Sequence, residues 1–390
     1  MPKSVRALIN CKMLGWARTQ AGYGLADAAQ KLGIDEPRLL SLEEGAETPT
    51  FAKLLDMAEL YKRPVSLFYL KEPPKDWQPI QDFRRLPGAE SAFSPQLTYV
   101  IRLARERREV ALAVKKEMNE VVRAFGMRAT LETAVEPLAQ RLRQYLGATS
   151  DAQQRWGKKA FEGWRSLIEA QDILVFVVPR LRMREMRGTA LAEAQLPVIL
   201  VNGKDRSNGR VFTLLHELCH LVLRQSGVSN VGGDRDDAPN PAVERFCNAV
   251  AAAIMMPSDW LLHEPLVMKK GSVKTWDDDE LEALALRFGA SPEAALRRLL
   301  TLGLTTKAFY ESKRPLYQKF YDQLEEKKEK TSGGPDYHLQ VLGQLGRAFT
   351  QLIFQGYHDR YFTLRDVAGL LNMKVTTVPA MEKAAFGLAG

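Results

Sequence analysis

The chain has 390 residues, a length typical of two to four domains. Hydrophobic residues make up 45% and charged residues 26%, which excludes a disordered or fibrous chain. No apolar run reaches the ~20 residues that span a bilayer, no secretory signal is visible, and three cysteines are too few for a disulfide framework. We therefore expect a cytoplasmic protein with no membrane partner. The net charge of +8 permits nucleic-acid binding without indicating it.

Residues 1–70 predict a small helical domain at the N-terminus. The expected helices span 7–21, 25–32, 35–45 and 51–61, and a short segment at 65–70 closes the domain. Gly33 stops the second helix, and Asp35 is a suitable N-cap for the third. Short helices joined by a glycine-containing turn are typical of a helix-turn-helix domain.

Residues 71–168 predict a basic helical connector. Over 75–165 the sequence has 17 Lys and Arg against 11 Asp and Glu, and Arg102–Lys116 alone carries six positive charges on an amphipathic helix. That helix could contact phosphates, or its charges could simply form a solvated face.

A central α+β domain is expected over 169–275 and a helical C-terminal region over 276–390. Strands are predicted at 173–178 and 196–201, with a possible third strand between them, and helices at 211–225 and 241–255. The C-terminal region predicts helices at 280–288, 292–302, 308–330, 337–356 and 364–371. The fold class is therefore multidomain and mostly α-helical.

The most informative motif is His216-Glu217-Leu218-Cys219-His220, an H-E-x-x-H sequence on an apolar helix. Residues four apart leave the same face of a helix, so His216 and His220 can hold one zinc ion. Glu217 is then placed to act as general base on a water at the metal. Two structural histidines on a core helix are the alternative interpretation.

A catalytic zinc site needs a third protein ligand, and the helix at 241–255 offers one. Glu244 lies near its start, 24 residues beyond His220, and Asn248 follows on the same face. We predict that Glu244 is the third ligand and that Asn248 orients a ligand histidine. The alternative is a solvent-facing Glu244 stabilised by the helix dipole.

The segments FTLLHELCHLVL and ERFCNAVAAAIMMP resemble the zinc peptidase core of the ImmA/IrrE family, whose members read F-T-x-x-H-E-x-x-H and then E-x-x-A-[DN]-x-F-A-A-x-L-L-M-P. Cys247 and Val250 replace the usual alanine and phenylalanine, and neither is a predicted ligand. The segments Phe83–Gly88 and Leu284–Tyr310 also resemble the longer members, which carry an XRE-type helix-turn-helix at the N-terminus.

The resemblance implies a zincin-like fold at the centre of the chain and a zinc endopeptidase that cleaves a regulatory protein. The expected substrate is a transcriptional repressor of the XRE type, whose cleavage relieves repression of stress, prophage or mobile-element genes. Three hypotheses stay open: such an enzyme; a DNA-binding regulator or antitoxin-like protein whose zinc domain is a sensor or scaffold; and a degenerate peptidase fold used only for protein contacts.

The third helix of the N-terminal domain would be its recognition helix, and its charge is unfavourable for DNA. Arg38 and Ser41 are its candidate DNA contacts, but Ile34–Gly45 has one positive charge against four negative. An acidic helix repels phosphates, so DNA binding is expected to be weak. We predict that this domain mainly docks protein, either a second copy of the chain or the helix-turn-helix of a repressor.

Overall fold

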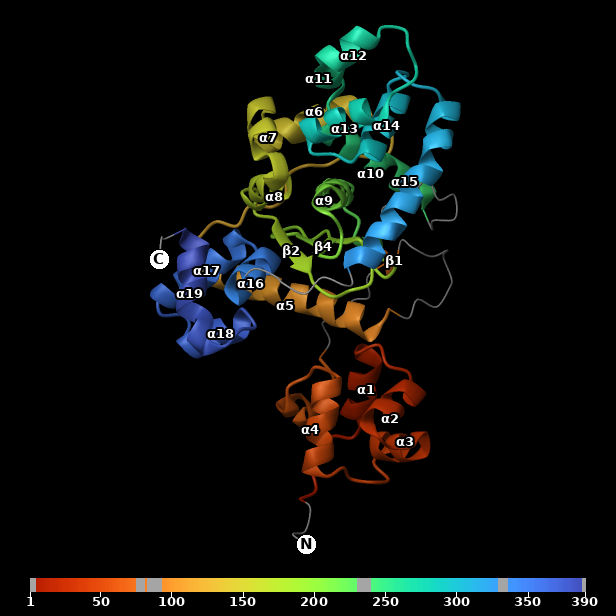
Figure 1. The fold of residues 1–390 in the computed structure, drawn as a ribbon. Coiled ribbons are helices and arrows are strands. Elements are labelled where there is room, and N and C mark those ends of the chain that lie inside the picture. Colours follow the sequence, from red (N-terminus) through yellow and green to blue (C-terminus); the bar gives the residue numbers. More distant parts are fainter. Residues whose placement is uncertain (1–4, 75–80, 83–92, 230–239, 329–335, 388–390) are drawn as a thin grey trace. The chain divides into compact units, whose positions relative to one another are not determined.

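A computed structural model describes residues 5–74, 81–82, 93–229, 240–328 and 336–387 (Figure 1). The chain divides into two compact units. Unit 1 comprises Met1–Ile80 and Gly88–Leu103, and unit 2 comprises Gln81–Pro87 and Ala104–Gly390. The segment Phe83–Gly88 lies outside the described residues. Within the described part of the chain, no helix has the length and apolarity to cross a membrane.

Unit 1 is helical and has its own core. Its elements are α1 (Lys12–Gln20), α2 (Leu25–Leu32), α3 (Glu36–Glu44), α4 (Phe51–Leu60), the 3-10 turn η1 (Val65–Tyr69) and the first residues of α5 (Pro95–Glu117). Gly33 ends α2 at φ 66°. The side chain of Asp35 accepts a hydrogen bond from the N–H of Arg38, and Thr50 accepts one from Lys53. Helices α2, α3 and α4 therefore confirm their predicted spans to within a residue.

The first predicted helix starts later than expected, at Lys12 instead of residue 7. The N–H of Ala7 donates to the carbonyl of Pro49 (2.9 Å), and the N–H of Phe51 donates to that of Val5 (2.8 Å). Residues 5–7 thus pair with the segment that leads into α4. Their backbone donors and acceptors have partners outside a helix, so the helical periodicity of the sequence is overridden there.

Unit 2 is built around a five-stranded mixed sheet of order β1-β5-β3-β4-β2. The strands are β1 (Gln81–Asp82), β2 (Leu174–Val178), β3 (Gly188–Leu191), β4 (Val198–Asn202) and β5 (Gly227–Ser229). Strands β2 and β4 are the two that the sequence predicts, and β3 is the possible third. Strands β1 and β5 were not predicted, because two or three residues are too few to show a period of two.

Helices cover both faces of this sheet (Figure 1). The residues Val175 and Val177 of β2 join a core with α8 (Ala160–Glu169) and α9 (Ser207–Val222). The alternate residue Phe176 contacts Phe349 of α17 on the other face, with ring centroids 5.3 Å apart. Because both faces are buried, the strands read as continuous apolar runs.

The other helices of unit 2 surround α9 and the sheet. They are α6 (Val135–Leu146), α7 (Ser150–Trp156), η2 (Gly157–Lys159), α10 (Pro241–Met255), α11 (Ser258–Leu262), α12 (Pro265–Lys270), α13 (Asp278–Phe288), α14 (Pro292–Thr301), α15 (Lys307–Lys328), α16 (Tyr337–Leu345), α17 (Arg347–His358), α18 (Leu364–Leu370), η3 (Val375–Thr377) and α19 (Val378–Phe386). The molecule is thus mostly helical, with one small sheet.

The helix predicted over 337–356 is wrong as a single element, because Gly346 separates α16 from α17. Gly346 has φ 81°, a conformation that ends a helix and favours glycine. The short helices α11, α12 and α19 were not predicted. The predicted break after α15 falls within 329–335, outside the described residues.

Candidate metal centre

Helix α9 places the H-E-x-x-H motif in the interior of unit 2. The helix is apolar on nearly every face and lies against β3 and β4. His216 and Glu217 are fully buried, and the exposed fraction of His220 is 1%. Polar groups are costly to bury without a partner, so these three side chains require a specific polar environment.

Helix α10 supplies that environment from the opposite side. Its N-cap is Asn240, whose side chain accepts from the N–H of Val243, and Pro241 occupies the first turn. This start puts Glu244 in the first turn and Asn248 one turn further, both facing α9. The local sequence therefore determines where along the helix the carboxylate stands.

Three buried side chains hold the other end of α10. The carbonyl of Ile254 accepts from Arg143, that of Met255 from Gln153 (2.8 Å), and that of Met256 from Arg298 (2.9 Å). The last carbonyls of a helix have no partner within it, and a positive charge there also complements the helix dipole. These contacts fix α10, and with it Glu244, against the core.

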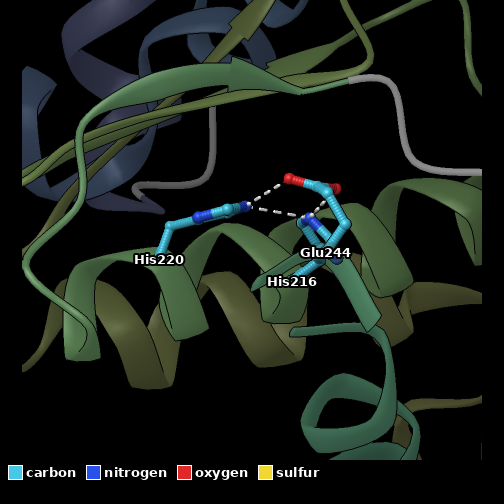
Figure 2. A group of neighbouring side chains, drawn as sticks. All are labelled: His216, His220 and Glu244. Carbon is cyan, nitrogen blue, oxygen red and sulfur yellow. Dashed lines mark hydrogen bonds and ion pairs between the residues drawn. The ribbon is translucent and has the colours of Figure 1, made fainter. Parts of the chain in front are cut away.

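The donor atoms of three side chains converge between the two helices. His216 Nε2 lies 3.3 Å from Glu244 Oε2, and His220 Nε2 lies 3.3 Å from Glu244 Oε1. The two Nε2 atoms are 3.1 Å apart. Figure 2 shows both imidazoles rising from α9 and the carboxylate reaching across to them. Among the described residues, this is the group of His, Cys, Asp and Glu side chains placed to share a metal ion.

The spacing of these atoms fits zinc. Ligand bonds of about 2.0–2.1 Å in a tetrahedron place neighbouring donor atoms ~3.3 Å apart. The three observed separations, 3.1, 3.3 and 3.3 Å, are close to that value. Three protein ligands leave the fourth tetrahedral position for water or substrate, as in catalytic zinc sites.

Asn248 determines which nitrogen of His216 faces the group. Its Oδ1 lies 3.0 Å from His216 Nδ1, and an amide oxygen can only accept. When His216 binds a metal through Nε2, its one ring proton therefore sits on Nδ1 and is donated to Asn248 Oδ1. Metal-binding histidines are commonly oriented through the second nitrogen in this way.

Charge interactions within the group are strong. Although burial by itself raises the pKa of Glu244, hydrogen bonds with His216 and His220 hold it well below its usual range. Burial lowers the pKa of His216, but the hydrogen bond and charge of Glu244 outweigh it and the net pKa is raised. The pKa of His220 is lowered, chiefly by burial. Glu244 is thus an ionised carboxylate in a buried site, which is what a dication requires.

The two cysteines near the motif lie outside the converging group. Cys219 and Cys247 are buried on α9 and α10. Burial and a hydrogen bond with Cys219 raise the pKa of the Cys247 thiol well above its usual value. Metal ligation requires a thiolate, so a thiol with a raised pKa is better suited to packing between the helices.

The comparison with protein families places this geometry in a known context. Residues 169–300 match the family model of the IrrE N-terminal-like domain, peptidase M78. The match contains β2, β3, β4, α9 and α10, and so includes the whole metal centre. It supports the resemblance to the ImmA/IrrE family and a metallopeptidase-like domain in this part of the chain. No curated protein sequence matches the chain significantly.

The predicted DNA contacts belong to unit 1. Arg38 is exposed on α3 and makes a two-point ion pair with Glu47, with nitrogen–oxygen distances of 3.1 and 3.2 Å. Ser41 is half-buried. The carboxylate of Glu47 thus pairs with the Arg38 guanidinium within unit 1.

The sequence did not identify the residues that hold the C-terminal end of α10. Arg143 and Gln153 lie more than one hundred residues from the carbonyls they bind. Neither belongs to a motif of fixed spacing. Arg143 lies among the apolar residues Leu138, Leu142 and Leu146, and this was the available signal, since a buried charge needs a partner.

Proposed function

We propose that this chain is a cytoplasmic zinc-dependent endopeptidase that cleaves a regulatory protein, an XRE-type transcriptional repressor. The observation that carries the proposal is the convergence of His216, His220 and Glu244 on one point, with Glu217 next to His216 on α9. A purely structural zinc site does not need a carboxylate beside its first histidine, whereas peptide hydrolysis does.

Each residue has a distinct role in this proposal. His216, His220 and Glu244 hold zinc, and Asn248 keeps the lone pair of His216 directed at it. Zinc, when bound, lowers the pKa of a water molecule to about 7 and polarises a carbonyl group. Glu217 takes the proton from the attacking water and returns it to the amine that leaves. The surrounding apolar side chains exclude bulk water, which strengthens these electrostatic interactions.

Unit 1 is proposed to be a helix-turn-helix domain that recognises the substrate. The turn at Gly33 between α2 and α3 is compatible with such a domain. The acidic character of α3 and the ion pair between Arg38 and Glu47 favour a protein partner over DNA. The second candidate function is a DNA-binding regulator or antitoxin-like protein with a zinc domain that senses or scaffolds. This second function predicts that the chain binds DNA and does not hydrolyse peptide bonds.

Co-expression tests the proposal directly. The chain is produced together with the XRE-type repressor encoded nearest its gene, and the repressor is followed by immunoblotting and mass spectrometry. The expected result is a discrete cleavage product that disappears when His220→Ala replaces the wild type. An intact repressor, together with tight operator binding by the chain itself, would favour the regulator.

A further inference from the structure

The two smallest residues of β3, Gly188 and Ala190, face helix α9. Gly188 pairs with Val201 of β4 and with Ser229 of β5, so it lies inside the sheet. Ala190 belongs to the core shared with α9, and alternate residues of a strand share a face. Gly188 and Ala190 are therefore the β3 residues directed at α9.

Gly188 is in close contact with the side chain of Glu217. A Cβ atom at position 188 would lie 2.3 Å from Glu217 Oε1 and 2.7 Å from Glu217 Cγ. It would also lie 2.6 Å from the Cγ2 methyl of Thr213, one turn earlier on the same face of α9. The φ of Gly188 is not positive, so its backbone conformation is open to any residue. Glycine is therefore needed at position 188 because a larger residue would overlap the side chain of Glu217.

We propose that Gly188 is a positioning residue for Glu217. The proposal rests on the proposed function, and it adds a residue of the sheet to the two helices that form the site. The backbone of Gly188 is the surface against which the Glu217 carboxylate packs, and Thr213 of α9 packs against the same surface. Glycine within a strand often marks such a close approach.

The size of the contact sets the expected effect of a methyl group. Ordinary contacts of a Cβ atom begin at 3.4 Å, so Gly188→Ala forces Oε1 to move by about 1 Å. A misplacement of ~1 Å in a catalytic group can cost on the order of 100-fold in rate. The three atoms nearest the new methyl belong to Glu217 and Thr213 and not to His216, His220 or Glu244. We expect kcat to fall about 100-fold in Gly188→Ala, with KM and zinc content unchanged.

A stability cycle on the metal-free protein tests the contact without using activity. The melting temperature is measured for the wild type, Gly188→Ala, Glu217→Ala and the double variant. Gly188→Ala should lower the melting temperature strongly in the wild type and less when Glu217 is alanine. Thr213 is present in both backgrounds, so the difference reports the carboxylate side chain alone.

Gly163→Ala is the matched control. A Cβ atom at Gly163 would lie 2.2 Å from the ring of Trp156, a clash of similar size that does not involve Glu217. It should lower the melting temperature equally in both backgrounds and leave kcat per folded molecule unchanged.

The outcomes separate this proposal from the proposed function. If Gly188→Ala lowers the melting temperature equally with and without the Glu217 side chain, or leaves kcat intact, Gly188 does not position Glu217. If Gly188→Ala fails to fold while the double variant folds, the contact is supported, and if both fail to fold, it is refuted. A wild type without peptidase activity contradicts the proposed function, whereas the stability cycle still decides the contact.

Discussion

Glu244 is the residue on which the candidate metal centre depends most, because its one carboxylate joins helices α9 and α10. Each of its oxygens lies 3.3 Å from a different imidazole. His216 and His220 are set four residues apart by the helix itself, but the carboxylate reaches them only because α10 packs against α9. The chemistry of the site therefore rests on one long-range contact between two locally determined helices.

The proposed metal-binding role of His216 and His220 predicts a loss of metal on substitution. The purified wild type should contain about one zinc per chain, the number that a single tetrahedral site holds. His216→Ala or His220→Ala should lose it, because two remaining protein ligands bind zinc weakly. Elemental analysis measures the zinc content, and circular dichroism checks that the helices remain. Full zinc content in either variant would place the metal elsewhere.

Glu244 and Asn248 should differ in their effect on zinc affinity. Glu244→Ala removes an ionised ligand and should weaken binding more than Asn248→Ala. The latter removes only the group that orients His216, a change that typically costs 10–100-fold. Competition with a chromophoric chelator gives both affinities. Unchanged zinc affinity in Glu244→Ala would assign the third ligand to a different side chain.

A buried ion pair on α8 attaches the C-terminal helices α16 and α17 to the rest of unit 2. Arg165 and Glu169 pair on α8 at 2.8 Å. Arg165 also donates to the carbonyl of Gly343 at the end of α16, and Glu169 accepts from the N–H of Ala348 at the start of α17. A Cβ atom at Gly346 would lie 2.2 Å from Glu169. The pair thus holds the break between the two helices in place.

Removing one partner of this pair should be costly. Burial raises the pKa of Glu169 despite the charge of Arg165, so the carboxylate is already in an unfavourable environment. Arg165→Leu should lower the free energy of unfolding by about 3–5 kcal/mol, because it leaves that carboxylate buried without its cation. Denaturant titration measures the loss. Arg165→Leu combined with Glu169→Leu should lose less, and an equal or greater loss would show that the charge interaction is not what holds the helices.

Several arginines of the basic helix predicted at 102–116 bind other groups of the same chain. Arg102 donates to the carbonyl of Lys62, and Arg108 donates to the carbonyls of Gln195 and Leu196. The guanidinium of Arg107 lies 5.4 Å from the ring centre of Phe176. These contacts favour a structural role for the arginines, although phosphate binding by this helix stays a prediction.

Elements with local signals could be predicted from the sequence, and elements defined by partners could not. Helices α3 and α4 carry their own N-caps, Asp35 and Thr50, so a short window contains the information. The break at Gly346 depends instead on two side chains of α8, about 180 residues earlier in the sequence. The metal centre divides in the same way: helical periodicity placed Glu244 and Asn248 on one face, but only the tertiary packing brings that face to α9.

The charge and the exposed side chains of unit 1 bear on the proposed division between substrate recognition and cleavage. Unit 1 contains ten Lys and Arg against nine Asp and Glu over residues 1–74, which gives little electrostatic attraction for DNA. It also exposes apolar side chains, among them Leu40 of α3 and Leu55 of α4, with exposed fractions of 42% and 46%. Contact of these side chains with a protein partner stays a prediction.

If Leu40 and Leu55 contact the repressor, their replacement should affect cleavage of the intact repressor and not of a short peptide. Replacing both with serine should raise KM for the intact repressor by about 10-fold or more, since the exposed parts of the two leucines, if buried on binding, contribute roughly 1–3 kcal/mol together. Cleavage of a short peptide that carries only the scissile bond should not change. Steady-state kinetics on both substrates provides the comparison. An equal effect on both, or tight sequence-specific DNA binding by the full chain at physiological salt, would contradict the docking role.

Glu217→Gln in the purified protein tests whether Glu217 provides the proton transfer in the proposed zinc-dependent hydrolysis. Zinc content, melting temperature and the rate of repressor cleavage are measured on the same samples. The amide keeps the shape of the side chain but cannot accept the proton, so zinc and fold should be retained while cleavage falls by roughly 100-fold or more. Full cleavage activity in Glu217→Gln, with zinc bound, would contradict the mechanism.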